Sequence, residues 1–150
     1  MEYKGIFETT LIDRTLEILH EYTGNKEDTL LLNCCTGLLI IPKQKLHDSL
    51  SNEEITETDW GIDKALIKKE TNKSIKKTVS HIRNAISHGG FEFGSESGEV
   101  ITHVLLRDWP SDDHADDKTN FELQISIASF KKFVLKFAEF ASDHKSDFID

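Results

Sequence analysis

Residues 83–88 combine the side chains of this chain whose types and spacing best suit chemistry. They read Arg-Asn-Ala-Ile-Ser-His and are followed directly by two glycines. Arginine supplies a permanent, fork-shaped cation that matches the oxygens of a phosphate group. Histidine is the side chain that takes up and releases protons near neutral pH. Arg83 and His88 therefore predict cleavage of a phosphodiester bond without a metal ion.

A helix must position this motif, and we predict one from about Asn72, as its N-cap, to His88, with Gly89 as its C-terminal stop. At about 100° per residue, a band roughly 60° wide forms the core face. The residues of this band are Ile75, Val79, Ile82 and Ile86. Asn84 and His88 are neighbours at i and i+4, whereas Arg83 and His88 are about 140° apart around the axis. We therefore do not expect Arg83 and His88 to meet on the surface of one chain.

The motif helix belongs to a basic segment of an acidic protein. Residues 64–88 contain seven lysines and arginines and one acid, which gives +6, whereas the whole chain has a net charge of −9. Such a basic strip on an acidic body is typical of a site for a polyanion. We predict that Lys73, Lys76 and Lys77 follow the phosphates of a polyanion, with His81 and Ser87 beside them on the polar side of the helix. The alternative is a solvated lysine-rich face.

The sequence before this segment predicts two further helices and a linker. The first helix runs from about 6 to 22, and the second from Asp28 or Thr29 to residue 41, where Pro42 ends it. The second is almost wholly apolar and is expected to be the central buried helix. Residues 48–59 contain five acids and no base, and we expect them to form an exposed linker.

After Gly90 the pattern changes to an alternation of apolar and polar side chains. This alternation predicts short strands at 91–93, 99–107 and 121–127. Residues 108–120 contain five aspartates and are predicted to form a polar loop, and a last helix at about 129–143 carries phenylalanines on one face. The predicted fold class is mainly α, with a small antiparallel β-sheet inserted at about 91–127, before the C-terminal helix.

The length and composition indicate one cytoplasmic domain. A chain of 150 residues with 37% hydrophobic residues can bury a single core. The first residues lack the layout of a signal peptide, and the longest uncharged run, 29–42, is too short to span a membrane. Cys34 and Cys35 are adjacent within that run, which favours two buried, reduced thiols over a disulfide. Because the sequence has neither a signal-peptide layout nor a run long enough to span a membrane, we expect no membrane association.

The spacing R-N-x-x-x-H resembles the signature of HEPN domains, small all-helical proteins of which many are metal-independent ribonucleases. The resemblance covers most of the chain and implies a HEPN-like antiparallel helical bundle over residues 1–150. It also implies a homodimer in which the motif helices of two chains face a shared RNA-binding cleft. By this resemblance, Arg83 holds the scissile phosphate, His88 is a general acid or base, and Asn84 orients His88 or the phosphate. Family members that are regulated by adenylylation carry a tyrosine two residues after the histidine, where this chain has Gly90.

These observations lead to a metal-independent endoribonuclease as the first hypothesis. The 2′-hydroxyl of RNA attacks the adjacent phosphate, His88 moves the proton and Arg83 stabilises the developing charge. No cofactor is expected. By analogy, a small ribonuclease of this kind suits a toxin or an anti-phage defence role, with an antitoxin or defence-system protein as a possible partner. The alternative is a non-catalytic HEPN-like module that binds a protein or a nucleotide.

Other potential sites are weaker. The acidic loop offers ligands for a divalent cation at Asp112, Asp113, His114, Asp116 and Asp117, but their spacing matches no EF-hand, and a solvated loop is the preferred interpretation. A further alternative is that this loop folds over the basic strip and imitates RNA. The chain has no C-x-x-C motif or paired histidines of a zinc site, and no metal is expected.

Overall fold

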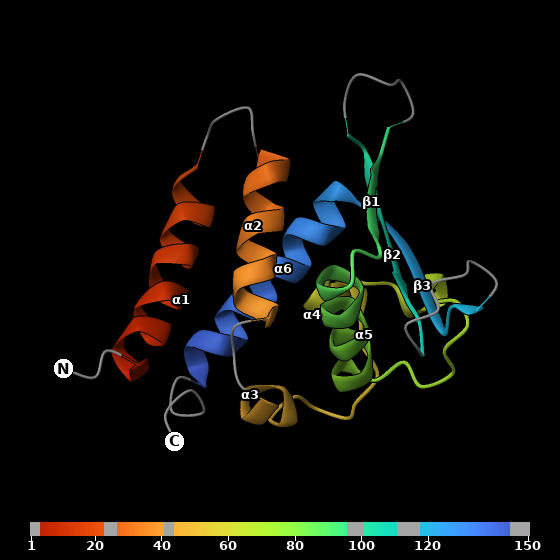
Figure 1. Ribbon diagram of the computed structural model, residues 1–150, viewed down its shortest axis with the longest axis horizontal. Helices are drawn as coiled ribbons and strands as arrows, with labels where there is room; N and C mark the ends of the chain where they lie inside the picture. The colour runs from red at the N-terminus through yellow and green to blue at the C-terminus, as the bar shows by residue number, and fades with distance from the viewer. Residues whose placement is uncertain (1–3, 23–26, 41–43, 96–100, 111–117, 145–150) are drawn as a thin grey trace.

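The computed structural model describes residues 4–22, 27–40, 44–95, 101–110 and 118–144, and this part of the chain is mainly helical (Figure 1). The elements follow in the order α1 (Lys4–Glu21), α2 (Glu27–Ile40), α3 (Gln44–Asp48), α4 (Glu57–Trp60), a 3-10 turn η1 (Lys64–Leu66), α5 (Ile75–Ser87), β1 (Phe91–Gly94), β2 (His103–Asp108), β3 (Phe121–Ser126) and α6 (Ile127–Asp143). No described helix is long and apolar enough to cross a membrane.

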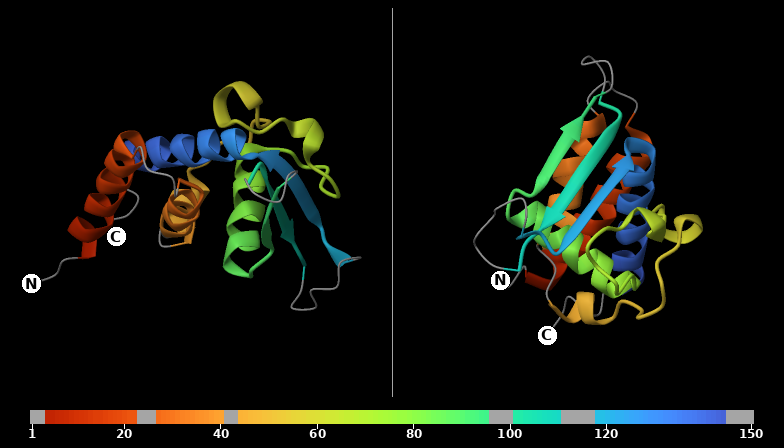
Figure 2. Two further views of the ribbon diagram at one scale, coloured as in Figure 1. Left: turned by 90° about the horizontal axis from the view of Figure 1, so that it is seen from above. Right: turned by 90° about the vertical axis from the view of Figure 1, so that its right-hand side faces the viewer.

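The last helix, α6, holds the two ends of the molecule together. It packs against α1, α2 and α4 and also contacts β2 and β3. Seen from above, α6 extends from α1 to the sheet, with α1, α2 and α5 on one side of it (Figure 2). Its phenylalanines form much of the core, because Phe130, Phe133 and Phe137 are each at most 1% exposed. Burial of side chains of this size supplies a large share of the hydrophobic stabilisation.

The three strands form an antiparallel sheet in the order β1-β2-β3, with the helices behind it (Figure 2). Alternate residues of β2 and β3 are buried, as the period-two pattern predicts. The buried cross-strand pairs are Val104 with Ile125, Leu106 with Leu123, and Asp108 with Phe121. The last pair places a carboxylate where the pattern calls for an apolar side chain. β2 packs against α5, so this carboxylate lies on the side of the motif helix.

The mainly α fold with a small antiparallel sheet is confirmed, with differences at the element ends. The motif helix is capped by Ser74, whose hydroxyl accepts a hydrogen bond from the Lys77 backbone N–H, while Asn72, the predicted cap two residues earlier, accepts from the Ser74 N–H. The C-terminal helix begins at Ile127 because Ser126 caps it. Both caps are serine hydroxyls that satisfy otherwise unpaired N–H groups.

The acidic segment 48–59 differs from the expected exposed linker. Leu50 and Ile55 are buried, at 4% and 0% exposure, and Glu54 forms an isolated backbone bridge with Ser74. The acidic side chains themselves are exposed. The charge pattern therefore predicts the exposure of these side chains, but it does not predict that the apolar residues between them are buried. Two apolar side chains and a backbone bridge are enough to fix the segment against the core.

The loop predicted at 108–120 also begins later than expected. Asp108 is the last residue of β2 and is 3% exposed, so it belongs to the interior rather than to a solvated acidic loop. The other four aspartates and His114 lie outside the described residues, as do residues 96–100 between the first two strands.

Candidate functional site

The motif residues all belong to α5 or its C-terminal cap, and the sequence explains where this helix begins and ends. Ser74 caps the N-terminus, and His88 is the C-terminal cap, with its backbone N–H donating to Asn84 and Ile86 carbonyl oxygens. Gly89 follows with φ of 74°, a left-handed conformation that favours glycine after a helix. The core face is as predicted, since Val79, Ile82 and Ile86 are buried. The polar residues therefore divide over the other sides of α5.

Arg83 lines a cavity of about 210 Å³ between α3 and α5, which we call the Arg83 pocket. The two helices pack beside each other (Figure 1). Gln44 and His47 of α3 and Lys76, Lys77, Ser80 and Arg83 of α5 form its main walls, and Asn52, Asn72 and Ser74 complete it. None of these residues is acidic. The structure thus brings Arg83 together with two of the three predicted RNA-binding lysines, Lys76 and Lys77, whereas Lys73 does not line the pocket.

The cations of this pocket contact few carboxylates. Arg83 Nη1 lies 3.5 Å from the side-chain oxygen of Gln44, and Lys76 Nζ donates to the Asp48 backbone carbonyl at 3.3 Å. Within the described residues, neither cation has a carboxylate within 4.0 Å. Lys77 Nζ lies 3.9 Å from Glu70. Burial lowers the pKa of His47, and the positive charge of Arg83 lowers it further, so this imidazole is neutral near pH 7.

Asn84 and His81 belong to a different cluster, on the side of α5 that faces β2. His81 is 4% exposed and its two ring nitrogens lie 2.7 Å from Asp108 Oδ2 and 3.0 Å from Glu70 Oε1. Asn84 also donates to Asp108 Oδ2, at 3.2 Å. The His81 ring stacks on Phe121 with centroids 4.6 Å apart. Because ionised carboxylates only accept hydrogen bonds, the His81 ring is the donor in this cluster.

Both carboxylates of this cluster are held in the ionised form. Burial on its own would raise the pKa of Asp108, but the hydrogen bonds from His81 and Asn84 outweigh it and the net effect is a lowered pKa. The pKa of Glu70 is lowered in the same way, against the effect of burial, by its hydrogen bond with His81. His81 thus serves an internal network in this conformation, and Asn84 is held by Asp108.

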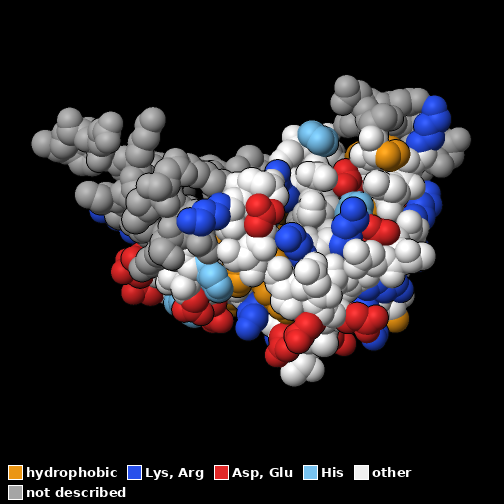
Figure 3. All heavy atoms as spheres, turned by 90° about the horizontal axis from the view of Figure 1, so that it is seen from below, with side chains coloured by type: hydrophobic (Ala, Val, Ile, Leu, Met, Phe, Trp, Pro, Cys, Tyr) orange, Lys and Arg blue, Asp and Glu red, His pale blue; other side chains and the backbone are white. Residues whose placement is uncertain are grey.

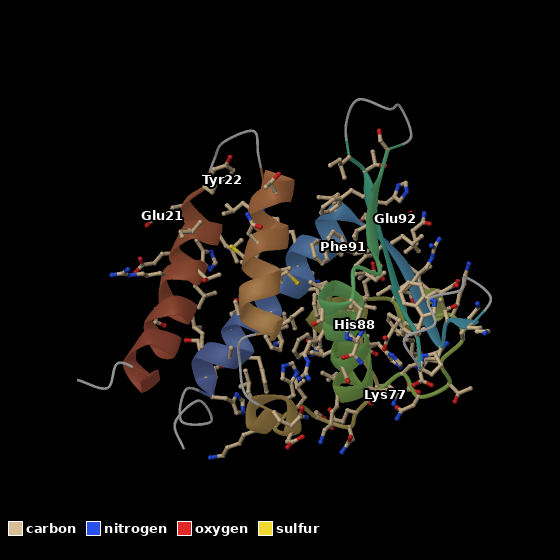
Figure 4. The ribbon with its side chains drawn as sticks, viewed as in Figure 1. Glu21, Tyr22, Lys77, His88, Phe91 and Glu92 are labelled. Atoms are coloured by element: carbon tan, nitrogen blue, oxygen red, sulfur yellow. The ribbon has the colours of Figure 1, made fainter. Side chains whose placement is uncertain are left out.

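His88 and Ser87 are exposed at the C-terminal end of α5. Figure 4 shows His88 and Lys77 at opposite ends of this helix, with His88 near the start of β1. His88 does not line the Arg83 pocket. The following Gly90 is needed for packing, since a Cβ there would lie 2.1 Å from the Arg107 carbonyl oxygen. Gly90 therefore allows the backbone after α5 to lie close against strand β2 of the same chain.

The predicted basic strip is partly neutralised in the structure. Lys64 pairs with Glu54, Lys69 lies 3.2 Å from Glu122, and Lys77 faces Glu70. Seen from below, Lys, Arg, Asp and Glu side chains are interspersed over the same face (Figure 3). The local excess of positive charge is therefore narrower than the sequence window of 64–88 indicates, and it is concentrated where Arg83 and Lys76 line the pocket.

Sequence reasoning missed several residues that the structure brings to the motif. Asp108 and Glu70 hold His81, and Gln44, His47 and Ser80 share the Arg83 pocket. One signal was present for Asp108, because the alternation of Val104 and Leu106 places residue 108 on the core face, where a carboxylate requires partners. The residues of α3 gave no such signal, since a helix of five residues has too short a pattern to recognise.

The described residues contain no group of three or more His, Cys, Asp or Glu side chains arranged to hold a metal ion. Cys34 and Cys35 are free thiols, and burial raises the pKa of both. Such thiols stay protonated at neutral pH and are poor nucleophiles.

Comparison with known proteins gives one match. A model of the family described as HEPN pEK499 p136 matches residues 1–148. The chain belongs to this HEPN family. No curated protein and no solved structure matches the chain significantly. The match extends over nearly the whole length and supports the resemblance of the R-N-x-x-x-H motif to that of HEPN domains.

Proposed function

We propose that this HEPN protein is a metal-independent endoribonuclease that acts as a homodimer. The observation that carries the proposal is the Arg83 guanidinium, which lines an acid-free cavity in an acidic protein and is paired with no carboxylate among the described residues. A half-buried cation in such surroundings favours an anion as its partner. Phosphate is the anion whose geometry the guanidinium fork matches.

In the proposed reaction, the 2′-hydroxyl of RNA attacks the adjacent phosphorus and the 5′-oxygen leaves. The products are a 2′,3′-cyclic phosphate and a 5′-hydroxyl, so no water and no metal ion enters the step. Arg83 stabilises the charge on the phosphate oxygens, and His88 transfers the proton. Lys73, Lys76 and Lys77 bind the RNA backbone, with Ser87 at the same exposed end of α5 as His88.

A dimer is part of this proposal because of where the two motif residues lie in one chain. Arg83 lines the pocket beside α3, whereas His88 is exposed beyond the last turn of α5. An active site that joins Arg83 of one chain to His88 of a second chain overcomes this separation. Asn84 donates to Asp108, and this hydrogen bond fixes the orientation of α5 about its own axis. That orientation sets the directions in which Arg83 and His88 extend from the helix.

The test is cleavage of total RNA by purified protein in the presence of EDTA. Wild type is expected to produce fragments with 2′,3′-cyclic phosphate ends, identified by mass spectrometry. Loss of a general acid-base group costs about 10²- to 10⁴-fold, so His88→Ala and Arg83→Ala are each expected to lose most of the activity. His20→Ala, an exposed histidine of α1, is the matched control and should remain active. Activity that requires Mg²⁺, or survives both substitutions, would exclude the mechanism.

The separation of Arg83 from His88 also favours a second candidate, a non-catalytic module that binds nucleotides. In that case the protein binds RNA or nucleotides through the Arg83 pocket but leaves RNA intact. Binding with no cleavage at any protein concentration would select this function. A toxin or defence role, with a partner protein, stays a prediction under either function.

A further inference from the structure

The Arg83 pocket carries positive charges, and none of its lining residues is an acid that could balance them. Lys76 and Arg83 contribute two positive charges without a carboxylate within 4.0 Å among the described residues, and Lys77 is partly balanced by Glu70 at 3.9 Å. The carboxylate of Asp48, the nearest acid in α3, accepts a hydrogen bond from Gln44 and does not line the pocket. The pocket therefore has an excess of about two positive charges.

A second observation also indicates a ligand. His47 lines the pocket and is 3% exposed, and its Nδ1 is buried without a hydrogen-bond partner among the described residues. Its Nε2 lies 3.1 Å from the Leu39 carbonyl oxygen, so only one ring nitrogen is satisfied. The neutral ring donates from Nε2 to this carbonyl, so Nδ1 is an acceptor; a hydroxyl donor, such as a ribose hydroxyl, can complete it, whereas a phosphate, which only accepts, cannot.

We propose that the Arg83 pocket binds a nucleotide through a terminal phosphate, that is, through a phosphate monoester. A monoester carries a charge of about −1.5 to −2 at pH 7, which matches the unbalanced charge of the pocket, whereas an internal phosphodiester carries only −1. The choice of a nucleotide rests on the proposed RNA function; the choice of a monoester rests on the charge alone.

The size and lining of the pocket agree with this ligand. Its volume of about 210 Å³ is below the range of about 300–1,000 Å³ typical of sites for drug-sized molecules, so it suits a phosphate with its attached sugar rather than a long segment of RNA. Gln44, Asn52 and Asn72 supply amide groups that can hydrogen-bond ribose hydroxyls, and Ser80 adds a hydroxyl from α5.

Adenosine 5′-monophosphate is the probe for a first experiment, with adenosine as the uncharged comparison, both titrated by calorimetry at low salt. The wild-type protein is expected to bind the monophosphate, and adenosine at least tenfold more weakly. Lys76→Gln should weaken binding of the monophosphate about tenfold, since one charged contact is lost. Ser80→Glu places a carboxylate in the pocket and should abolish binding. The matched controls, Lys68→Gln and Thr58→Glu, change exposed residues outside the pocket and should bind as wild type.

A second experiment distinguishes the end of an RNA strand from a free nucleotide as the source of the phosphate monoester. Short RNA with a 5′-phosphate is compared with the same RNA bearing a 5′-hydroxyl. Tighter binding of the 5′-phosphate RNA than of the 5′-hydroxyl RNA assigns the pocket to a strand end. Equal binding of the two RNAs by a protein that binds the monophosphate assigns the pocket to a free nucleotide, and both results support a monoester site.

The inference is overturned if the monophosphate and adenosine bind equally, if neither binds, or if Lys76→Gln binds no more weakly than Lys68→Gln. Failure of this inference is distinguishable from failure of the proposed function. Metal-free RNA cleavage that depends on Arg83 and His88, by a wild-type protein that does not bind the monophosphate, removes the monoester site and retains the ribonuclease. Binding of the monophosphate by a protein that cuts no RNA supports the pocket and removes the ribonuclease.

Discussion

At the scale of single residues, Asp108 has the greatest influence on the motif helix. Its carboxylate accepts hydrogen bonds from His81, from Asn84 and from the Trp109 backbone N–H. It is buried, so these three donors would lose a charged acceptor in a low-dielectric environment if the charge were removed. One aspartate therefore couples the end of β2 to the side of α5 that carries Asn84.

Asp108→Asn is expected to lower the free energy of unfolding by about 1–3 kcal/mol at pH 7, because it replaces the charged acceptor of the hydrogen bonds from His81 and Asn84 with a neutral one, while Glu70 still accepts from His81. The pKa of Asp108 is lowered by folding, so its contribution is complete above its ordinary value of 3.8 and is lost as the pH falls through the lowered value. The difference between wild type and variant should therefore shrink below about pH 4. Urea unfolding at pH 7 and at pH 3 measures both effects.

Asp59→Asn is the control for this prediction. Asp59 is an exposed aspartate of α4, and its substitution should change stability by no more than about 0.5 kcal/mol. If Asp108→Asn proves equally mild, or if its effect is the same at both pH values, the charge of Asp108 does not hold the network.

At the scale of elements, the turn between α5 and β1 decides how the motif helix ends. Gly89 and Gly90 are adjacent but are required for different reasons. Gly89 has a positive φ and open space around it, whereas Gly90 packs against the Arg107 carbonyl oxygen and the Trp109 ring. The backbone bonds from Gly90 N–H to the Ala85 carbonyl and from Arg107 N–H to the Gly90 carbonyl join helix and sheet at this point.

Gly89→Ala is expected to cost about 1–2 kcal/mol, the usual cost of a side chain in the left-handed region. Gly90→Ala should cost more, because its Cβ would lie 2.1 Å from a backbone oxygen that cannot move without displacing β2. Thermal unfolding of the two variants compares these costs directly. A larger loss for Gly89→Ala would contradict the packing at this turn.

The elements that the sequence predicts best are those with a long, clear period. Ile75, Val79, Ile82 and Ile86 are enough to define α5, and the phenylalanines of α6 define the last helix. The five residues of α3 are too few for a period, so the sequence does not predict the helix that forms one wall of the Arg83 pocket. Asp108 was assigned to a loop because its polar neighbours outweighed the alternation of β2. The motif was thus visible in the sequence, whereas its surroundings depend on contacts between distant segments.

At the scale of the whole molecule, the proposed active site requires two chains. If each site takes Arg83 from one chain and His88 from the other, a mixed dimer of Arg83→Ala and His88→Ala chains contains one intact site. Random exchange makes about half of the dimers mixed, so the mixture should recover about one quarter of wild-type activity. Each variant exchanged with itself should stay inactive.

Light scattering at micromolar concentration provides the accompanying measurement of mass. A strictly monomeric protein would exclude the shared site, and a dimer whose mixture regains nothing would place both residues of each site in one chain.

At the base of the β2–β3 hairpin, the end of β2 is joined to the start of β3 by paired residues. Asp108 pairs with Phe121, and the Asn120 N–H donates to the Asp108 carbonyl at 3.0 Å, so the two strands fix both ends of the segment between them. Doubling the length of a closed loop costs only about 0.6 kcal/mol. The chain between Asp108 and Asn120 therefore begins and ends at fixed, neighbouring points, and a change in its length adds little to the free energy of closing it. Because four of the chain's aspartates lie between these two residues in the sequence, the formal charge of the domain can change at positions outside the helix that carries its motif.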